Sequence, residues 1–375
     1  LTTEAGYMPG AQMYCWPNIR VETPDAGDID WARDLILGDL LGDFPFVDEA
    51  SRAHALAAVL LPFCRAMVNG PTPLHLIDAP TPGTGKSLIA NLVNVIATGR
   101  VSDPITGARD SDEWRKRITA ALIEAPNVVV FDNLSRKIDN PHLAAALSTT
   151  SWSDRELGAS RTLTLPIHCT WIATGNNLPL SNEIARRTVL CRLDAGMARP
   201  WNRSMSEFRH PHIIQWATEN RADLIRACLT LVIVGMKDTS DMLEAPVLGG
   251  FETWAVLMGR ILKGIGVEGF LSNQESAYEA AVEEEDEWEA FVEIWFAKHG
   301  DSGVRTTDLR DLALDNELLV EALGSGGDNS QSVKMGQSLR TMRGRTVGKY
   351  KITVRIIPGG RKLYALMEAK NETKS

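Results

Sequence analysis

The feature that most constrains the fold is a short apolar stretch that ends in a glycine-rich turn and leads directly into a helical pattern. The apolar stretch is 74–79, the turn is Pro80-Thr-Pro-Gly-Thr-Gly-Lys-Ser87, and apolar residues recur at helical spacing over 88–97. Glycines let backbone N–H groups converge on an anion, and a helix N-terminus adds its positive dipole end. This order of strand, tight loop and helix predicts a phosphate-binding loop.

The residue types of the loop favour ATP and Mg²⁺ as cofactors. Lys86 is placed to reach the β- and γ-phosphates, and the Ser87 hydroxyl is placed to ligate Mg²⁺. The remaining predicted cradle is Pro82, Gly83, Thr84 and Gly85. The usual spacing of this motif has glycine where this chain has Pro80, and an ordinary strand-to-helix turn is the alternative interpretation.

Strand and helix patterns alternate between residues 71 and 195, which predicts an α/β fold with a parallel sheet. The expected strands are 74–79, 127–131, 168–174 and 189–193, and the expected helices are 86–97, 112–124, 141–149 and 181–187. Residues 30–68 predict packed helices, either an oligomerisation collar or a plain support. The region 205–282 reads as helical throughout. The expected domains are 1–70 (linker and collar), 71–200 (ATPase core), 201–283 (helical lid) and 284–375.

Two further strands end in polar residues that suit the same site. Asp132 closes an apolar strand and would hold Mg²⁺, directly or through water. Asn133 follows it, and an amide can orient a water but cannot accept its proton, so the general base stays open, with Glu124 a weak candidate. Asn176 ends the next strand and would sense the γ-phosphate, unless it only forms a turn.

Seven arginines are candidates for contacts outside the loop. Arg186 and Arg187 close a helix, where one would act as an arginine finger on a neighbouring subunit; the alternative is favourable placement at a helix C-terminus. Arg155 and Arg161 flank a predicted hairpin turn and would grip single-stranded DNA, or simply be solvated. Arg199, Arg203 and Arg221 are weaker candidates for nucleotide sensors, and ordinary surface salt bridging is the favoured interpretation for each.

The C-terminal region predicts three helices followed by a β-hairpin, which is the pattern of a winged helix. Nine basic residues and no acidic ones lie between 331 and 366. The candidate DNA-binding residues among them are Lys334, Arg340, Arg343, Arg345, Lys349 and Lys351. A basic third helix with a basic wing favours DNA contact, although a winged helix can also bind proteins.

Whole-chain composition is less informative than this local charge. The net charge of −9 does not by itself indicate nucleic-acid binding. No apolar run is long enough to cross a bilayer, and the five scattered cysteines indicate reduced thiols, so we expect a cytoplasmic protein with no membrane partner. Because the chain begins at Leu1, we expect it to be a segment of a longer protein.

The order of these motifs resembles AAA+ ATPases of the superfamily 3 helicase type. The segments that carry the resemblance are Pro-Gly-Thr-Gly-Lys-Ser, Val-Val-Val-Phe-Asp-Asn, Ala-Thr-Gly-Asn-Asn and Ala-Arg-Arg, within residues 30–270. More narrowly, the chain is similar to the helicase portion of phage and mobile-element primase–helicases. The resemblance implies a homo-oligomer, a hexameric ring, that moves along single-stranded DNA in a bacterial or phage-infected cell, with a primase–polymerase before Leu1.

The resulting prediction is an ATP-dependent DNA helicase that acts on single-stranded and forked DNA. Two alternatives stay open. One is an initiator that uses ATP to assemble at an origin without unwinding, which Asn133 favours, and the other is a helicase loader.

Overall fold

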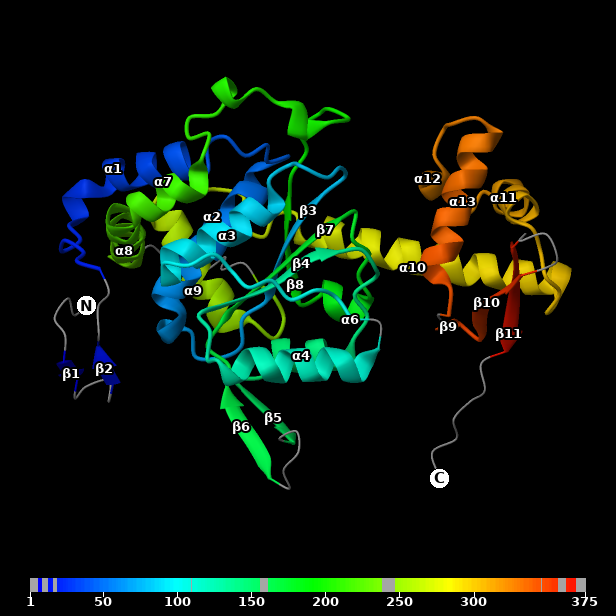
Figure 1. Ribbon diagram of the computed structural model, residues 1–375, viewed down its shortest axis with the longest axis horizontal. Coiled ribbons are helices and arrows are strands. Elements are labelled where there is room, and N and C mark those ends of the chain that lie inside the picture. The colour runs from blue at the N-terminus through cyan, green and yellow to red at the C-terminus, as the bar shows by residue number, and fades with distance from the viewer. Residues whose placement is uncertain are drawn as a thin grey trace. The chain divides into compact units, whose positions relative to one another are not determined.

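The computed structural model divides the chain into two units, residues 1–277 and 278–375, and each is described by itself (Figure 1). The described residues are 6–8, 13–15, 19–108, 110–155, 161–237, 247–344, 346–356 and 362–368. None of the helices in these ranges combines the length and the apolar character needed to cross a membrane.

A parallel sheet forms the centre of the first unit, which confirms the mixed α/β prediction. Its strands, within the described residues, are β3 (Leu74–Ala79), β4 (Val128–Leu134), β7 (Thr170–Asn176) and β8 (Thr188–Arg192). Their order is β4-β7-β3-β8, and Ile105 forms a parallel bridge to Phe131 beyond β4. Because the strands are parallel, the chain leaves β3, β4 and β7 at one carboxyl edge, where ligands bind in open α/β sheets.

Helices cover both faces of this sheet. One face packs on α2 (Glu49–Cys64), α3 (Lys86–Thr98), α8 (Arg221–Lys237) and α9 (Glu252–Gly264). The other packs on α4 (Ser111–Ile123), α5 (Pro141–Leu147) and α6 (Asn182–Ala185). Side chains alternate along β3, so that Ile77 enters the first core and Leu76 the second. Burial on both faces explains the continuous apolar strands of the sequence.

The region before the sheet is helical, as expected. It contains α1 (Ile29–Arg33), a π-helical segment η2 (Asp34–Leu40) and α2. In α2, the only exposed residue among those described is Glu49. A helix with so little exposed surface packs as a support within the unit, and the oligomerisation collar stays a prediction.

The sequence predicted helix throughout 205–282, and the structure shows that this is wrong for the first residues of that region. Residues 194–212 hold only short 3₁₀ turns, η4 (Pro200–Asn202) and η5 (Met205–Glu207), before α7 (Ile213–Glu219) and α8. The reason is local, because Pro200 and Pro211 interrupt the segment and cannot continue a helix. Trp201 of this irregular segment lies against Gly83 of the glycine-rich turn.

The second unit contains most of α10 (Gln274–His299), followed by α11 (Thr306–Asp315), α12 (Val320–Leu323) and α13 (Asp328–Met342). The described residues then form a three-stranded sheet of β9 (Thr346–Val347), β10 (Tyr350–Ile356) and β11 (Lys362–Glu368). The order of the strands in this sheet is β11-β10-β9. Trp288, Phe291 and Trp295 of α10 form its core with Leu339 and Ile352. The helices and the hairpin of the sequence prediction are therefore present, and the winged-helix interpretation stays a prediction.

Candidate functional site

The turn after β3 has a backbone that only glycine accommodates. Gly83 has φ +78° and Gly85 has φ +103°, both in the left-handed region. A Cβ on Gly83 would lie 3.1 Å from the Trp201 ring, and one on Gly85 would lie 2.9 Å from the Phe44 ring. These two aromatic residues therefore confine the loop against the N-terminus of α3, with little room for any side chain.

Lys86 is held at the centre of the site by oxygen atoms. Its ammonium donates to the Asn176 side-chain oxygen at 2.7 Å, to the Thr81 carbonyl at 3.2 Å and to the Thr84 hydroxyl at 3.2 Å. The side chain is buried, and burial lowers the pKa of Lys86, while Asp78 and Asp132 oppose that shift. A phosphate oxygen can replace these neutral partners and would pair with the charge more strongly.

Ser87, the second residue of α3, lies next to Asp132 of β4. The Ser87 hydroxyl donates to Asp132 at 2.7 Å, and the Thr174 hydroxyl donates to the same carboxylate oxygen at 2.5 Å. Thr174 in turn accepts the Asn133 backbone N–H at 2.8 Å. A hydroxyl beside a carboxylate supplies the hard oxygen ligands that Mg²⁺ prefers. The donor set thus fits Mg²⁺, with Ser87 and Asp132 as the residues that would hold it.

A pocket of about 420 Å³ opens in front of the phosphate loop. The loop, Asn133, Thr174 and Asn176 are among the residues that line it. Apolar residues also line it, namely Phe44, Met205, Phe208 and Ile213, together with the charged Asp43 and Arg203. A pocket with polar groups and apolar walls suits both the phosphates and the base of a nucleotide.

Sequence reasoning missed several residues of this site. Thr174 binds Asp132, Phe44 packs on Gly85, and Asp78 pairs with Arg192 at the carboxyl edge. The signal for Asp78 was present, because it is a carboxylate inside an otherwise apolar strand. No local pattern indicated Phe44, which comes from a distant segment.

Two of the weaker expectations are wrong. Glu124 follows α4 and precedes the amino end of β4, so it lies at the opposite end of that strand from Asp132 and cannot serve its water. Arg221 is buried and donates to the carbonyls of Ile96 and Ala97 at the C-terminus of α3, away from the loop. Arg203 does line the pocket, whereas Arg199 is exposed.

Arg186 and Arg187 lie at the amino edge of the sheet. The Arg187 carbonyl accepts the Leu74 N–H at 2.9 Å, which places this residue at the start of β3. Arg187 donates to the Ser148 hydroxyl at 2.7 Å and pairs with Glu183 at 2.8 Å, with 15% of its side chain exposed. Arg186 is 57% exposed and contacts only the Glu183 carboxylate among the described contacts. Arg187 is therefore fixed within the unit, and Arg186 is directed to solvent.

The predicted hairpin is present as β5 (Ser151–Arg155) and β6 (Thr162–Pro166), which project beyond α4 (Figure 1). Gly158, at its turn, lies outside the described residues. Trp152 and Asp154 pair with Leu165 and Leu163 on the face toward α4. The opposite face is polar and exposed: Ser151, Ser153, Arg155, Thr162 and Thr164.

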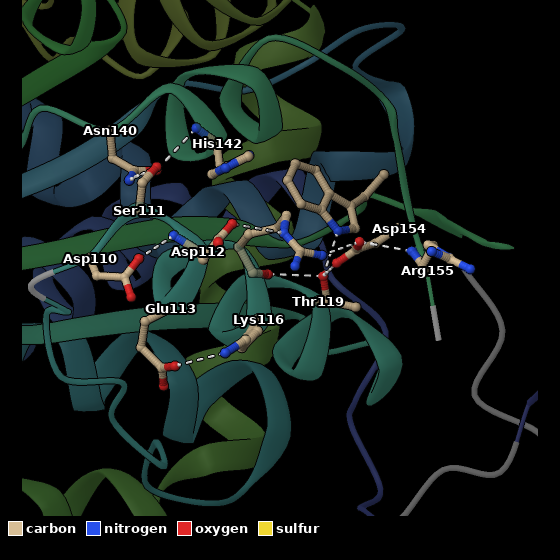
Figure 2. Close-up of polar contacts among 12 residues, drawn as sticks. Asp110, Ser111, Asp112, Glu113, Lys116, Thr119, Asn140, His142, Asp154 and Arg155 are labelled. Carbon is tan, nitrogen blue, oxygen red and sulfur yellow. Dashed lines mark hydrogen bonds and ion pairs between the residues drawn. The ribbon is translucent and has the colours of Figure 1, made fainter. Parts of the chain in front are cut away.

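A polar cluster attaches this hairpin to α4. Asp154 accepts from the Arg115 guanidinium and from the Thr119 hydroxyl at 2.5 Å, and the Trp152 indole N–H donates to Thr119 at 2.8 Å. Burial would raise the pKa of Asp154, but the bonds from Thr119, the Arg155 N–H and Arg115 outweigh it and lower that pKa. Figure 2 shows Asp154 directed toward Thr119 while Arg155 points away from the helix.

The described basic candidates of the second unit are all exposed: Lys334, Arg340, Arg343, Lys349 and Lys351. They come from α13, the turn after it, the β9–β10 turn and β10. Arg345 lies outside the described residues. The fold thus presents the basic segment to solvent, with apolar side chains of the same elements in the core.

Comparison with known proteins gives limited support. No family model matches the chain, and no curated protein sequence matches it. Among solved structures, the chain is similar to the C-terminal region of NrS-1 (TM-score 0.37, 13% identity, 93% of this chain and 77% of that one). It is also similar to SCCmec type IV Cch, an active helicase (0.35, 11%, 92% and 71%), and to JCV helicase (0.29, 13%, 67% and 72%). At these TM-scores the likeness carries no weight by itself, so function must be inferred from the site.

Proposed function

We propose that the chain is an ATP-driven motor that moves along single-stranded DNA and unwinds forked duplex, in the replication of a phage or mobile element. The observation that carries the proposal is the convergence of Lys86, Ser87, Asp132 and Asn176 at one sheet edge. Lys86 and the glycine loop would bind the phosphates, and Asn176, now bonded to Lys86, would contact the γ-phosphate and orient water. Bound Mg²⁺ would supply charge stabilisation on the transferred phosphoryl group.

The amino edge suggests how copies of the chain cooperate. Arg186 lies near the amino end of β3, and the phosphate loop follows its carboxyl end. The strand is about 17 Å long at 3.3 Å per residue, so Arg186 is too far away to reach the loop of its own chain. It would therefore complete the site of a neighbouring copy, as an arginine finger does, in a ring that we propose to be hexameric. Arg187 would hold it in place through Glu183, which pairs with both arginines.

The exposed face of the hairpin supports DNA as the partner. Hydroxyl groups and Arg155 are side chains that contact phosphate oxygens without reading sequence. Arg161, at the start of β6, adds a second cation on the other side of the turn. The basic second unit, which we interpret as a winged helix, would contact the duplex at the fork.

Unwinding of a forked duplex with ATP and Mg²⁺ tests the proposal directly. We expect the wild type to separate the strands, and we expect single-stranded DNA to raise its ATPase rate. Arg155→Ala should weaken binding to single-stranded DNA. It should also reduce, by about one, the slope of the logarithm of the binding constant against the logarithm of the salt concentration. An ATPase rate indifferent to DNA would instead point to a loader.

A second candidate function follows from Asn133. This residue is exposed next to Asp132, at φ +53°, in a position suited to place a water, yet its amide cannot accept a proton. A slow ATPase that assembles on DNA as an origin-binding switch would have this property. DNA binding with ATP but no strand separation, at every salt concentration tested, would favour the switch.

A further inference from the structure

A buried ion pair lies beside the nucleotide site but outside its pocket. Asp78 and Arg192 are register partners on the neighbouring strands β3 and β8, and they pair through their side chains. Asp78 is 4% exposed and Arg192 is 31% exposed. The second carboxylate oxygen of Asp78 accepts the Leu178 N–H at 3.1 Å. Burial raises the pKa of Asp78, and the Arg192 charge opposes that shift, so the carboxylate needs its guanidinium partner.

The same pair reaches the turn that follows β7. Arg192 donates to the side-chain oxygen of Asn177 at 2.6 Å, and the Asn177 N–H donates to the Ala79 carbonyl at 3.1 Å. Asn177 has φ +43°, a left-handed conformation that is strained for a residue with a Cβ. Such strain persists only where surrounding contacts determine the backbone, and it clusters at functional sites.

The residue immediately before this strained turn is Asn176, whose side-chain oxygen accepts from Lys86 at 2.7 Å. The chain has little freedom here, because a Cβ on Gly175 would lie 2.7 Å from the Leu178 Cβ. Three bonds thus fix Asn177 and Leu178, two of them from the Asp78–Arg192 pair. Because Asn176 directly precedes this turn, we expect a change in the turn to alter the direction of the Asn176 amide.

We propose that Asp78 and Arg192 are positioning residues that hold the strained turn at Asn177 and so aim the Asn176 amide at the γ-phosphate. The inference rests on the proposed ATPase function and deepens it. The pair would have no contact with nucleotide, and it would act on the rate of hydrolysis more than on binding. An ion pair that only stabilised the sheet would leave the rate of the folded enzyme unchanged.

Arg192→Gln tests this, because glutamine lacks the positive charge that pairs with Asp78 and the two separate NH₂ groups that bond Asp78 and Asn177. We expect kcat for ATP hydrolysis to fall about 10- to 100-fold, as small misplacements of catalytic groups do, with KM changed less than about 3-fold. Asn177→Gly is the second variant: it accepts positive φ without strain, leaves the ion pair intact and removes the acceptor for Arg192. It should lower kcat by a similar factor. Arg100→Gln, at an exposed arginine, is the matched control and should leave kcat unchanged.

A double-mutant cycle separates positioning from other roles. In an Asn176→Ala background, Arg192→Gln should cause no further loss of kcat, because the group through which it acts is absent. Multiplied losses would overturn the inference and make Arg192 an independent contributor. A raised KM at unchanged kcat would also overturn it, as would full activity in both Arg192→Gln and Asn177→Gly. If the wild type itself hydrolyses no ATP, or Lys86→Ala still does, the proposed function fails and the inference fails with it.

Discussion

The two edges of the central sheet differ in how they hold charge. At the carboxyl edge, Lys86, Asp78 and Asp132 are surrounded by bonding partners within the unit. At the amino edge, Arg186 extends into solvent with a single described carboxylate partner. A buried charge with fixed partners is preorganised for a small anionic ligand, whereas an exposed arginine on a fixed helix end is available to a second chain. This difference is what the proposed arrangement requires, in which two copies share one catalytic site.

Among changes at the two edges of the sheet, we expect the loss of Lys86 at the carboxyl edge to reduce activity most. Lys86→Ala removes the only described lysine that lines the pocket, so ATP hydrolysis and unwinding should be abolished. Steady-state phosphate release measures the loss, and Lys116→Ala, at an exposed lysine on α4, is the control. Equal activity in the two variants would contradict the assignment of the site.

Arg186→Ala should have the next largest effect, about 10³-fold on kcat, because an arginine finger contributes on that order. Its melting temperature should match the wild type, since the side chain is exposed. Arg187→Ala should lower the melting temperature as well, because Arg187 also binds Ser148. Mixing Arg186→Ala with Lys86→Ala protein should restore activity at mixed interfaces. Mixtures without any recovery would show that Arg186 does not act on a neighbour.

The attachment of the hairpin predicts a smaller effect on stability. Asp154→Asn leaves Arg115 without its buried carboxylate partner, and the free energy of unfolding should fall by about 1–3 kcal/mol. Asp112→Asn removes a mostly exposed partner of the same Arg115 and should change the free energy of unfolding by less than about 0.5 kcal/mol. Denaturant unfolding compares the two. Similar values for both variants would mean that the cluster does not fix the hairpin.

The last expected effect is absent at neutral pH and appears only in acid, and it comes from two neutral histidines buried in the first unit. Burial lowers the pKa of His54 to about 4 and of His75 to about 3, so the unfolded chain binds protons that the folded chain excludes. The free energy of unfolding should therefore keep its full value above pH 6.5 and should fall as the pH drops toward 4, by about 1.4 kcal/mol per pH unit for each histidine. His75→Gln, measured by denaturant unfolding at pH 7 and pH 5, should show a shallower decline. An unchanged decline would exclude His75 as its source.

Much of the first unit was predictable because its signals are local. The phosphate loop, α3 and the four strands depend on glycine, proline and apolar spacing within a few residues of one another. The irregular residues 205–212 were predicted to be helical because the helical apolar spacing of 212–236 was extended back past Pro211, which interrupts the helix. The order of the motifs placed Asp132 and Asn176 near Lys86, since consecutive parallel strands deliver their ends to one edge.

The sequence by itself determined which residues we propose for the phosphate chemistry, because these residues lie in one continuous loop and at the last positions of strands. Only the tertiary structure decided which arginine is available to a neighbour, what attaches the hairpin, and what holds Asn176. Those answers depend on bonds between residues far apart in the chain, such as Arg192 and Asp78, which are 114 positions apart. No local pattern encodes such a bond, since it forms only when packing of the sheet brings β3 and β8 into register.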